Sequence, residues 1–159
     1  MRKTILAIFI PFFLSAGEIE ITSKNFEGDQ EKGVSKFTGD VVATKENNKI
    51  TSDTMFVYTT KDNKIQKMEA IGNAKFWMSD KGKNYKGNAD TIIYVPDSRE
   101  YTLIGNGYLE SIEEKRKVYG DRIYVNEINK KATVEGSKKP AKFIFYTEDN
   151  KTKDSNKIK

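Results

Sequence analysis

The segment Tyr101–Leu109, which reads Tyr-Thr-Leu-Ile-Gly-Asn-Gly-Tyr-Leu, alternates apolar or small residues with mostly polar ones. Alternation with a period of two places one set of side chains on one face of a β-strand. The same alternation recurs in the segments 37–43 and 68–78, where Val42 and Ile71 interrupt the polar set as Ile104 does here. The sequence therefore predicts strands with one apolar face and one solvated face.

Glycines recur at the centre of these strands. Gly39, Gly72, Gly105 and Gly136 are spaced by 33, 33 and 31 residues, in the contexts FTGDV, AIGNA, LIGNG and VEGS. A second unit recurs between them, in which Asp53, Asp90 and Asp121 precede apolar residues at what we take to be strand starts. A repeat of this length indicates one hairpin unit stacked several times. Glycine inside a strand indicates a bulge, a bend or a close approach of another backbone.

Turn-forming residues separate the predicted strands. Clusters rich in Asn, Asp, Gly or Pro occur at residues 46–49, 61–63, 80–83, 96–98 and 127–130. These residue types favour turns for local backbone reasons. Because the strands are short and no amphipathic helix pattern occurs between them, we expect an all-β antiparallel meander, sandwich or barrel.

The two termini differ from the central segment. Residues 1–17 have a basic start, an apolar run of ten residues and small residues at the end, which is typical of a cleaved signal peptide. Residues 148–159 are polar and charged, and we expect a disordered tail. This leaves residues 18–147 as one exported β-domain. Loss of Arg2 and Lys3 would lower the formal net charge from +5 to +3.

The composition argues against several functions. The chain contains no cysteine and no histidine, which excludes Ser-His-Asp and Cys-His nucleophilic sites and His-rich metal sites. Its positive charges are scattered, whereas a nucleic-acid-binding surface is a clustered basic stripe. The repeated aspartates are expected to cap turns or strand ends, since equivalent positions in a stack would not face one cleft as a catalytic pair must. We therefore expect no enzyme activity, no cofactor, no metal site and no nucleic-acid partner.

The strand parity predicts an apolar interior that mixes methionines and aromatic residues with small ones. Methionine adapts to irregular partners, so such an interior, if open at its ends, could accept acyl chains. Burial of a chain of about ten carbons would contribute roughly 8 kcal/mol at about 0.8 kcal/mol per CH₂. The predicted lipid-binding interior consists of Phe37, Val41, Met55, Val57, Met68, Phe76, Met78, Ile92, Tyr94, Leu103, Leu109 and Ile123.

The signal peptide, the repeated units Phe37–Val41 and Leu103–Leu109, and the Ala89-Asp90 and Gly120-Asp121 pairs together resemble the LptA/OstA-like family of periplasmic lipopolysaccharide-export proteins. The resemblance covers residues 19 to 145. It implies an open antiparallel β-jellyroll that binds lipopolysaccharide in the periplasm through its acyl chains. It also implies head-to-tail self-association, an LptC-like inner-membrane partner and an LptD-like outer-membrane partner. LptC and the N-terminal part of LptD share this fold.

Two other functions remain open at this point. A periplasmic carbohydrate- or protein-binding β-domain without lipid transport would present a surface aromatic platform, for which Phe56, Trp77 and Tyr124 are the candidates. An enzyme would need two carboxylates in one cleft, and no motif in the sequence places two together. An apolar interior that is open at its ends would favour the lipid carrier over both.

Overall fold

The computed structural model describes residues 18–147, which form ten antiparallel β-strands and contain no helix. This confirms the predicted all-β class. No helix in this range is long and apolar enough to cross a membrane. The predicted signal peptide (1–17) and tail (148–159) lie outside the described residues. The strands are β1 (Ile19–Thr22), β2 (Asn25–Asp29), β3 (Val34–Lys45), β4 (Asn48–Thr59), β5 (Ile65–Asp80), β6 (Lys83–Val95), β7 (Glu100–Ser111), β8 (Arg116–Asn126), β9 (Lys131–Glu135) and β10 (Lys142–Phe145).

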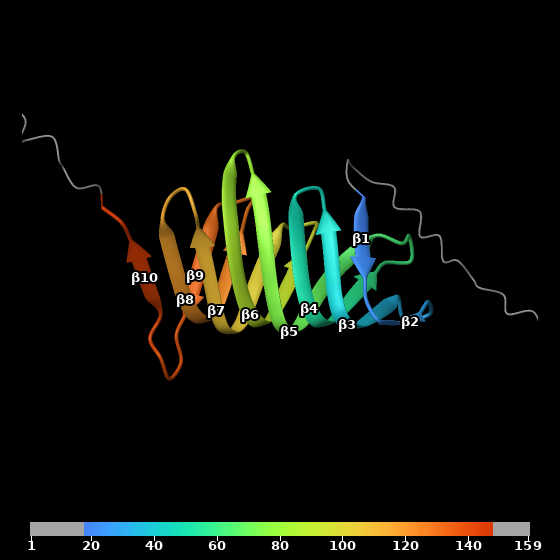
Figure 1. Cartoon of the computed structure of the whole chain (residues 1–159). Coiled ribbons are helices and arrows are strands. Elements are labelled where there is room, and N and C mark those ends of the chain that lie inside the picture. Colours follow the sequence, from blue (N-terminus) through green and yellow to red (C-terminus); the bar gives the residue numbers. More distant parts are fainter. Residues whose placement is uncertain (1–17, 148–159) are drawn as a thin grey trace, which may run out of the picture.

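The strands form one open sheet in the order β1-β3-β4-β5-β6-β7-β8-β10. At one end, β1 pairs with residues 42–45 of β3, and β2 pairs with residues 34–38 of the same strand. At the other end, β10 pairs with residues 116–119 of β8, and β9 pairs with residues 122–126 of the same strand. Two short strands therefore flank each end of the stack of hairpins (Figure 1).

A line of bulges crosses the sheet at the repeated glycines. Gly39, Gly72 and Gly105 have φ angles of +86°, +83° and +79°, and the Asp or Asn that follows each also has a positive φ. The strand register shifts at each of these pairs. Glycine reaches positive φ at little cost, and extra residues on one strand bend it. The glycine repeat therefore produces the bend that the sequence indicated.

The bends fold the single sheet into two facing layers. Layer 1 contains β1, β10 and residues 41–45, 48–52, 74–80, 83–89, 107–111 and 116–120. Layer 2 contains β2, β9 and the remaining halves of the long strands. Met78 of layer 1 and Tyr101 of layer 2, although far apart along their strands, line the same cavity. The long strands in Figure 1 curve round from one layer to the other, which gives an open β-jellyroll.

Two details of the predicted repeat are wrong. Gly136 is not a fourth central glycine, because β9 ends at Glu135 and the chain leaves the sheet there to return as β10. Asp53, Asp90 and Asp121 also do not begin strands, because β4, β6 and β8 continue through the bend. Instead, they lie in the register gaps opposite the bulges.

Asp53 and Asp90 nevertheless have a structural role at the bend. The Asn73 side-chain amide donates to the Asp53 carboxylate at 3.0 Å, and the Asn106 amide donates to Asp90 at 3.2 Å. The bulges of β5 and β7 are therefore each joined to the preceding strand by one side-chain hydrogen bond.

We predict that Gly72→Ala lowers the free energy of unfolding by about 2 kcal/mol. The new Cβ would lie 2.6 Å from the Asp53 carboxylate in a backbone of φ +83°. Gly82→Ala is the matched control, because it has a similar φ of +78° but no atom within 4 Å of the new Cβ. Its cost should be about 1 kcal/mol. Urea denaturation followed by circular dichroism measures both, and equal losses would contradict a contribution from the Asp53 contact.

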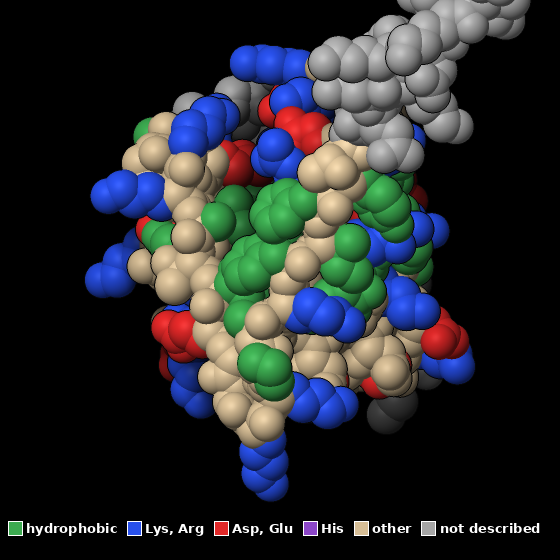
Figure 2. Space-filling model, turned by 90° about the vertical axis from the view of Figure 1, so that its left-hand side faces the viewer, with side chains coloured by type: hydrophobic (Ala, Val, Ile, Leu, Met, Phe, Trp, Pro, Cys, Tyr) green, Lys and Arg blue, Asp and Glu red, His purple; other side chains and the backbone are tan. Residues whose placement is uncertain are grey.

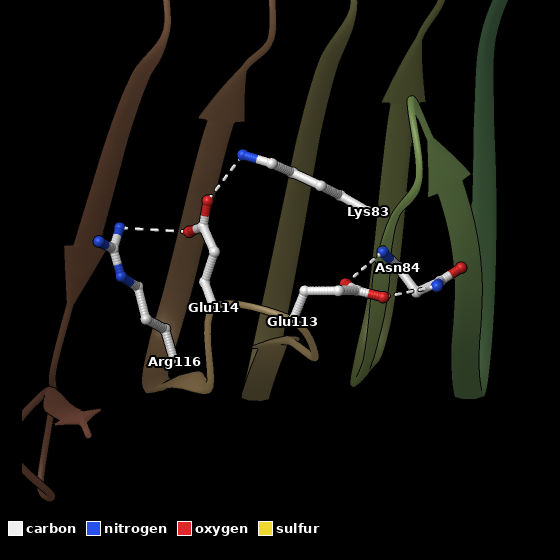
Figure 3. Close-up of polar contacts among 5 residues, drawn as sticks. All are labelled: Lys83, Asn84, Glu113, Glu114 and Arg116. Carbon is white, nitrogen blue, oxygen red and sulfur yellow. Dashed lines mark hydrogen bonds and ion pairs between the residues drawn. The ribbon is translucent and has the colours of Figure 1, made fainter. Parts of the chain in front are cut away.

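The five predicted turns coincide with connections between strands. Two further turns were not predicted, namely β2–β3 at residues 30–33 and β7–β8 at residues 112–115. A cluster of polar contacts joins the β7–β8 turn to the start of β6 (Figure 3). The Glu113 carboxylate accepts hydrogen bonds from the backbone and side-chain amides of Asn84, both at 2.7 Å. Glu114 lies 2.8 Å from Lys83 and 3.3 Å from Arg116. These carboxylates connect neighbouring hairpins along the free margin of layer 1, which is the margin away from the bend.

The same cluster predicts acid sensitivity. The Asn84 hydrogen bonds lower the pKa of Glu113, and Lys83 lowers the pKa of Glu114. A lowered pKa stabilises the fold above the ordinary glutamate value near 4.5, and this contribution disappears as the pH falls through the folded-state pKa. Thermal unfolding at pH 7, 5, 4 and 3 should therefore show a falling Tm. The Glu113→Gln/Glu114→Gln variant should show a shallower fall, and an unchanged slope would exclude the cluster as its source.

Candidate binding groove

The interior predicted from strand parity forms one cluster between the two layers. Eight of the twelve predicted residues are buried, and the other four are partly buried and pack against them. The buried eight are Val41, Met55, Val57, Met68, Phe76, Ile92, Leu103 and Ile123; the partly buried four are Phe37, Met78, Tyr94 and Leu109. The structure therefore brings all twelve side chains together, and their contact with lipid remains a proposal.

Part of this interior, on β4, β6 and β8, was not predicted from strand parity. On each of these strands, the inward-facing residues change between even and odd numbers at the aspartate. Before the aspartate they are even-numbered on β4 and β8, and odd-numbered on β6. Extending the parity of Met55 and Val57 backwards excludes Ile50, although Ile50 packs against the core. A change of parity at each repeated Asp was the signal that could have identified them. The missed residues of these strands are Ile50, Tyr85, Ala89 and Val118.

The interior is open at both ends of the stack. At the β1/β2 end, Phe26 is 46% exposed and its ring lies 5.0 Å from that of Phe37. At the β9/β10 end, Phe143 and Phe145 are 51% and 62% exposed. Both share the inner face of layer 1, because Phe143 pairs with the inward residue Val118. Figure 2, which views this end, shows hydrophobic side chains gathered in the middle with basic residues around them.

A cavity of about 410 Å³ lies where the free margins of the two layers approach each other. Its apolar lining includes Ala43, Ile50 and Met78 from layer 1 and Met68 and Tyr94 from layer 2. Its polar lining comes from the turns and strand ends, and it consists of Thr44, Lys45, Glu46, Asn48, Lys49, Ser79, Asp80, Arg99 and Glu127. The cavity is therefore apolar toward the groove and charged toward solvent.

Burial affects the titratable groups of this cavity. Burial and the neighbouring Asp80 raise the pKa of Glu127, while Arg99 acts in the opposite direction. Burial also raises the pKa of Tyr94 and Tyr101, whose rings stack at 4.5 Å. Both phenols are neutral at physiological pH, so they can line an apolar groove without placing a charge in it.

The aromatic platform of the alternative function is not assembled. Phe56 and Tyr124 lie on the outer face of layer 2, with three strands between them. Trp77 lies on the outer face of layer 1, where it pairs with Lys49 and Lys86. Three aromatic residues that are split between opposite outer faces cannot contact one ligand.

Residues 18–147 contain no side-chain group suited to a metal ion. No group of three or more Asp or Glu side chains within residues 18–147 is placed to hold a metal ion. Asp53 and Asp90 lie opposite separate bulges, each with its own asparagine partner. The apolar groove is thus the main feature of this part of the chain with which a ligand could interact.

The sequence comparisons identify relatives along most of this domain. Residues 20–131 match the family described as LptA/(LptD N-terminal domain) LPS transport protein. The lipopolysaccharide export system protein LptA of Escherichia coli K12 is 32% identical over 132 residues, which cover 77% of this chain and 69% of the relative. LptA of Shigella flexneri gives the same values.

A solved structure supports the fold independently. The crystal structure of LptH, described as the LptA homologous periplasmic component of the conserved lipopolysaccharide transport device from Pseudomonas aeruginosa, superposes with a TM-score of 0.71. It is 20% identical in sequence, and the match covers 82% of this chain and 96% of that one. The two chains therefore share one architecture.

Proposed function

Because the chain belongs to the family of LptA proteins and LptD N-terminal domains, which are lipopolysaccharide transport proteins, we propose that it is a periplasmic lipopolysaccharide bridge. In this proposal the acyl chains lie in the apolar groove, and the lipid passes along it from the inner toward the outer membrane. The protein acts as a carrier and not as an enzyme. Export would require the predicted signal peptide, cleaved after residue 17.

The observation that carries this proposal is an apolar interior that is open at both ends. A closed β-sandwich would cover its terminal aromatic residues, whereas Phe26, Phe143 and Phe145 are about half exposed or more. Release of an acyl chain into water would lose about 0.8 kcal/mol per CH₂. A groove that continues into a neighbouring groove avoids this loss, so the open ends suit the transfer of lipid between similar domains.

The open ends also suit the partners of such a bridge. The outer edges of β1, β2, β9 and β10 carry unpaired backbone groups, which can pair with strands of another chain. We propose that copies of this chain associate head to tail through these edges. We further propose that the terminal copies contact an LptC-like inner-membrane protein and an LptD-like outer-membrane protein.

In-cell photo-crosslinking tests the lipid path. A photoreactive phenylalanine analogue at Tyr94, which faces the groove, should form adducts with lipopolysaccharide. The same analogue at Tyr124 is the matched control, because this tyrosine is also partly buried but faces outward from layer 2. Adducts at Tyr94 alone would support the groove as the lipid path. A folded, exported protein without adducts at Tyr94 would contradict the proposed function.

A further inference from the structure

The outer face of layer 1 carries two adjacent rows of basic and aromatic side chains. In the first row, Lys49, Trp77, Lys86, Glu110 and Lys117 are successive cross-strand partners from β4 to β8. Cross-strand partners share one face of a sheet, so these side chains project together from the molecule. Lys49 Nζ lies 5.4 Å from the Trp77 ring.

The second row runs beside the first. Lys75, Asn88, Tyr108, Tyr119 and Lys142 are successive partners from β5 to β10. The rings of Tyr108 and Tyr119 lie 4.9 Å apart, and Lys142 Nζ lies 4.4 Å from the Tyr119 ring. We call the two rows together the basic face.

The positive charge of the basic face is largely uncompensated. Among the ion pairs of residues 18–147, only Lys86 of its five lysines is paired, with Glu110 at 3.4 Å. The outer face of layer 2 differs, since Lys67 pairs with Glu69 there at 2.6 Å, and further carboxylates, including Glu100, lie on the same face. The two outer faces of one folded sheet therefore differ in charge, and the basic face complements an anionic ligand.

We propose that the basic face binds the phosphorylated saccharide of the lipid whose acyl chains occupy the groove. This inference rests on the proposed function and adds a second binding surface to it. Lysine ammonium groups bind phosphates as point charges, and aromatic rings offer flat apolar surfaces to sugar rings. The combination of lysines with Trp77, Tyr108 and Tyr119 fits a charged saccharide better than it fits an isolated anion.

Lys49 connects the groove with the basic face. It lines the cavity at the margin of layer 1 and also stands at the start of the first row, beside Trp77. When the acyl chains of a lipid lie in the groove, its saccharide would emerge at this margin, because the cavity lining changes there from apolar to charged. Its saccharide would then meet Lys49 first and Trp77 and Lys86 next.

Trp77 provides a direct test because it is the only tryptophan in the chain. Lipopolysaccharide stripped of its acyl chains is titrated into the full exported protein while tryptophan fluorescence is recorded. We expect a saturable change that weakens with added salt. The Lys75→Gln/Lys86→Gln/Lys117→Gln variant should bind roughly tenfold more weakly, if each exposed lysine contributes about a factor of two.

The matched control removes the same charge from layer 2. Lys36→Gln/Arg122→Gln/Lys131→Gln should leave the affinity within about twofold, because these residues lie on the opposite outer face. Absence of a fluorescence change, or equal weakening by both variants, would overturn the inference. A response to anionic lipid vesicles but not to the deacylated saccharide would also overturn it, in favour of a membrane surface.

Crosslinking at Tyr94 separates this inference from the proposed function. Intact lipopolysaccharide should still form adducts at Tyr94 in the variant that lacks Lys75, Lys86 and Lys117. If wild-type Tyr94 forms adducts but the saccharide does not bind the basic face, only the saccharide site is wrong. If wild-type Tyr94 forms no adducts, the proposed function itself is contradicted.

Discussion

Replacement of Leu103 by Ala is expected to lower the free energy of unfolding by about 3 kcal/mol, with a range of roughly 2–5 kcal/mol. Leu103 is 2% exposed and lies in the core cluster at the centre of layer 2. Its cross-strand partners are Ile92 on β6 and Ile123 on β8, both of which are also buried. Removal of its side chain would lose apolar burial and leave a cavity that rigid neighbouring strands cannot fill.

Ile104→Ala is the matched control because Ile104 is the next residue on the same strand. It is 37% exposed on the outer face, so its truncation should cost less than about 1 kcal/mol. Urea denaturation followed by circular dichroism measures both variants. Equal losses in the free energy of unfolding would contradict the placement of Leu103 in the interior and Ile104 on the outer face.

The sequence predicts the fold well where the outcome depends only on residues of the same strand. Alternation places Leu103 inside and Ile104 outside, and the structure agrees. The glycine repeat predicts a line of bends, and Gly39, Gly72 and Gly105 form it. Both features depend on local geometry, namely the two-residue period of a strand and the freedom of glycine at positive φ.

Prediction fails where the outcome depends on the partner strand. Parity changes at Asp53 because bulges on β3 and β5 face it, and the sequence of β4 marks this position only by the repeated aspartate. The turn at residues 112–115 contains Ile112, two glutamates and Lys115, which are not typical turn residues. Its geometry is stabilised by Asn84, which is about 30 residues away in sequence. Gly136 resembles the other repeat glycines, but its strand ends at the edge of the sheet, where no further strand faces a bulge.

The paired substitution Phe143→Asp/Phe145→Asp is expected to weaken strongly the proposed head-to-tail self-association without unfolding the chain. Both rings project from the inner face of β10 at the open end, where they stack at 6.2 Å and remain more than half exposed. Aromatic residues at the centre of an interface typically contribute about 2 kcal/mol or more each. Loss of both should weaken association by roughly a thousandfold. Sedimentation velocity over a range of protein concentrations measures this change.

Ile144→Asp distinguishes loss of the groove contact from damage to the edge strand. Ile144 lies between the two phenylalanines but faces outward, since it pairs with Lys117. This variant should therefore still associate, and equal loss in both variants would indicate that strand pairing, not groove continuity, joins the copies. A chain with both phenylalanines replaced should still form lipid adducts at Tyr94, which lies on β6 and lines the cavity between the layers. It should fail to pass that lipid to a second copy, because charged side chains would then interrupt the apolar path that makes transfer without exposure to water possible.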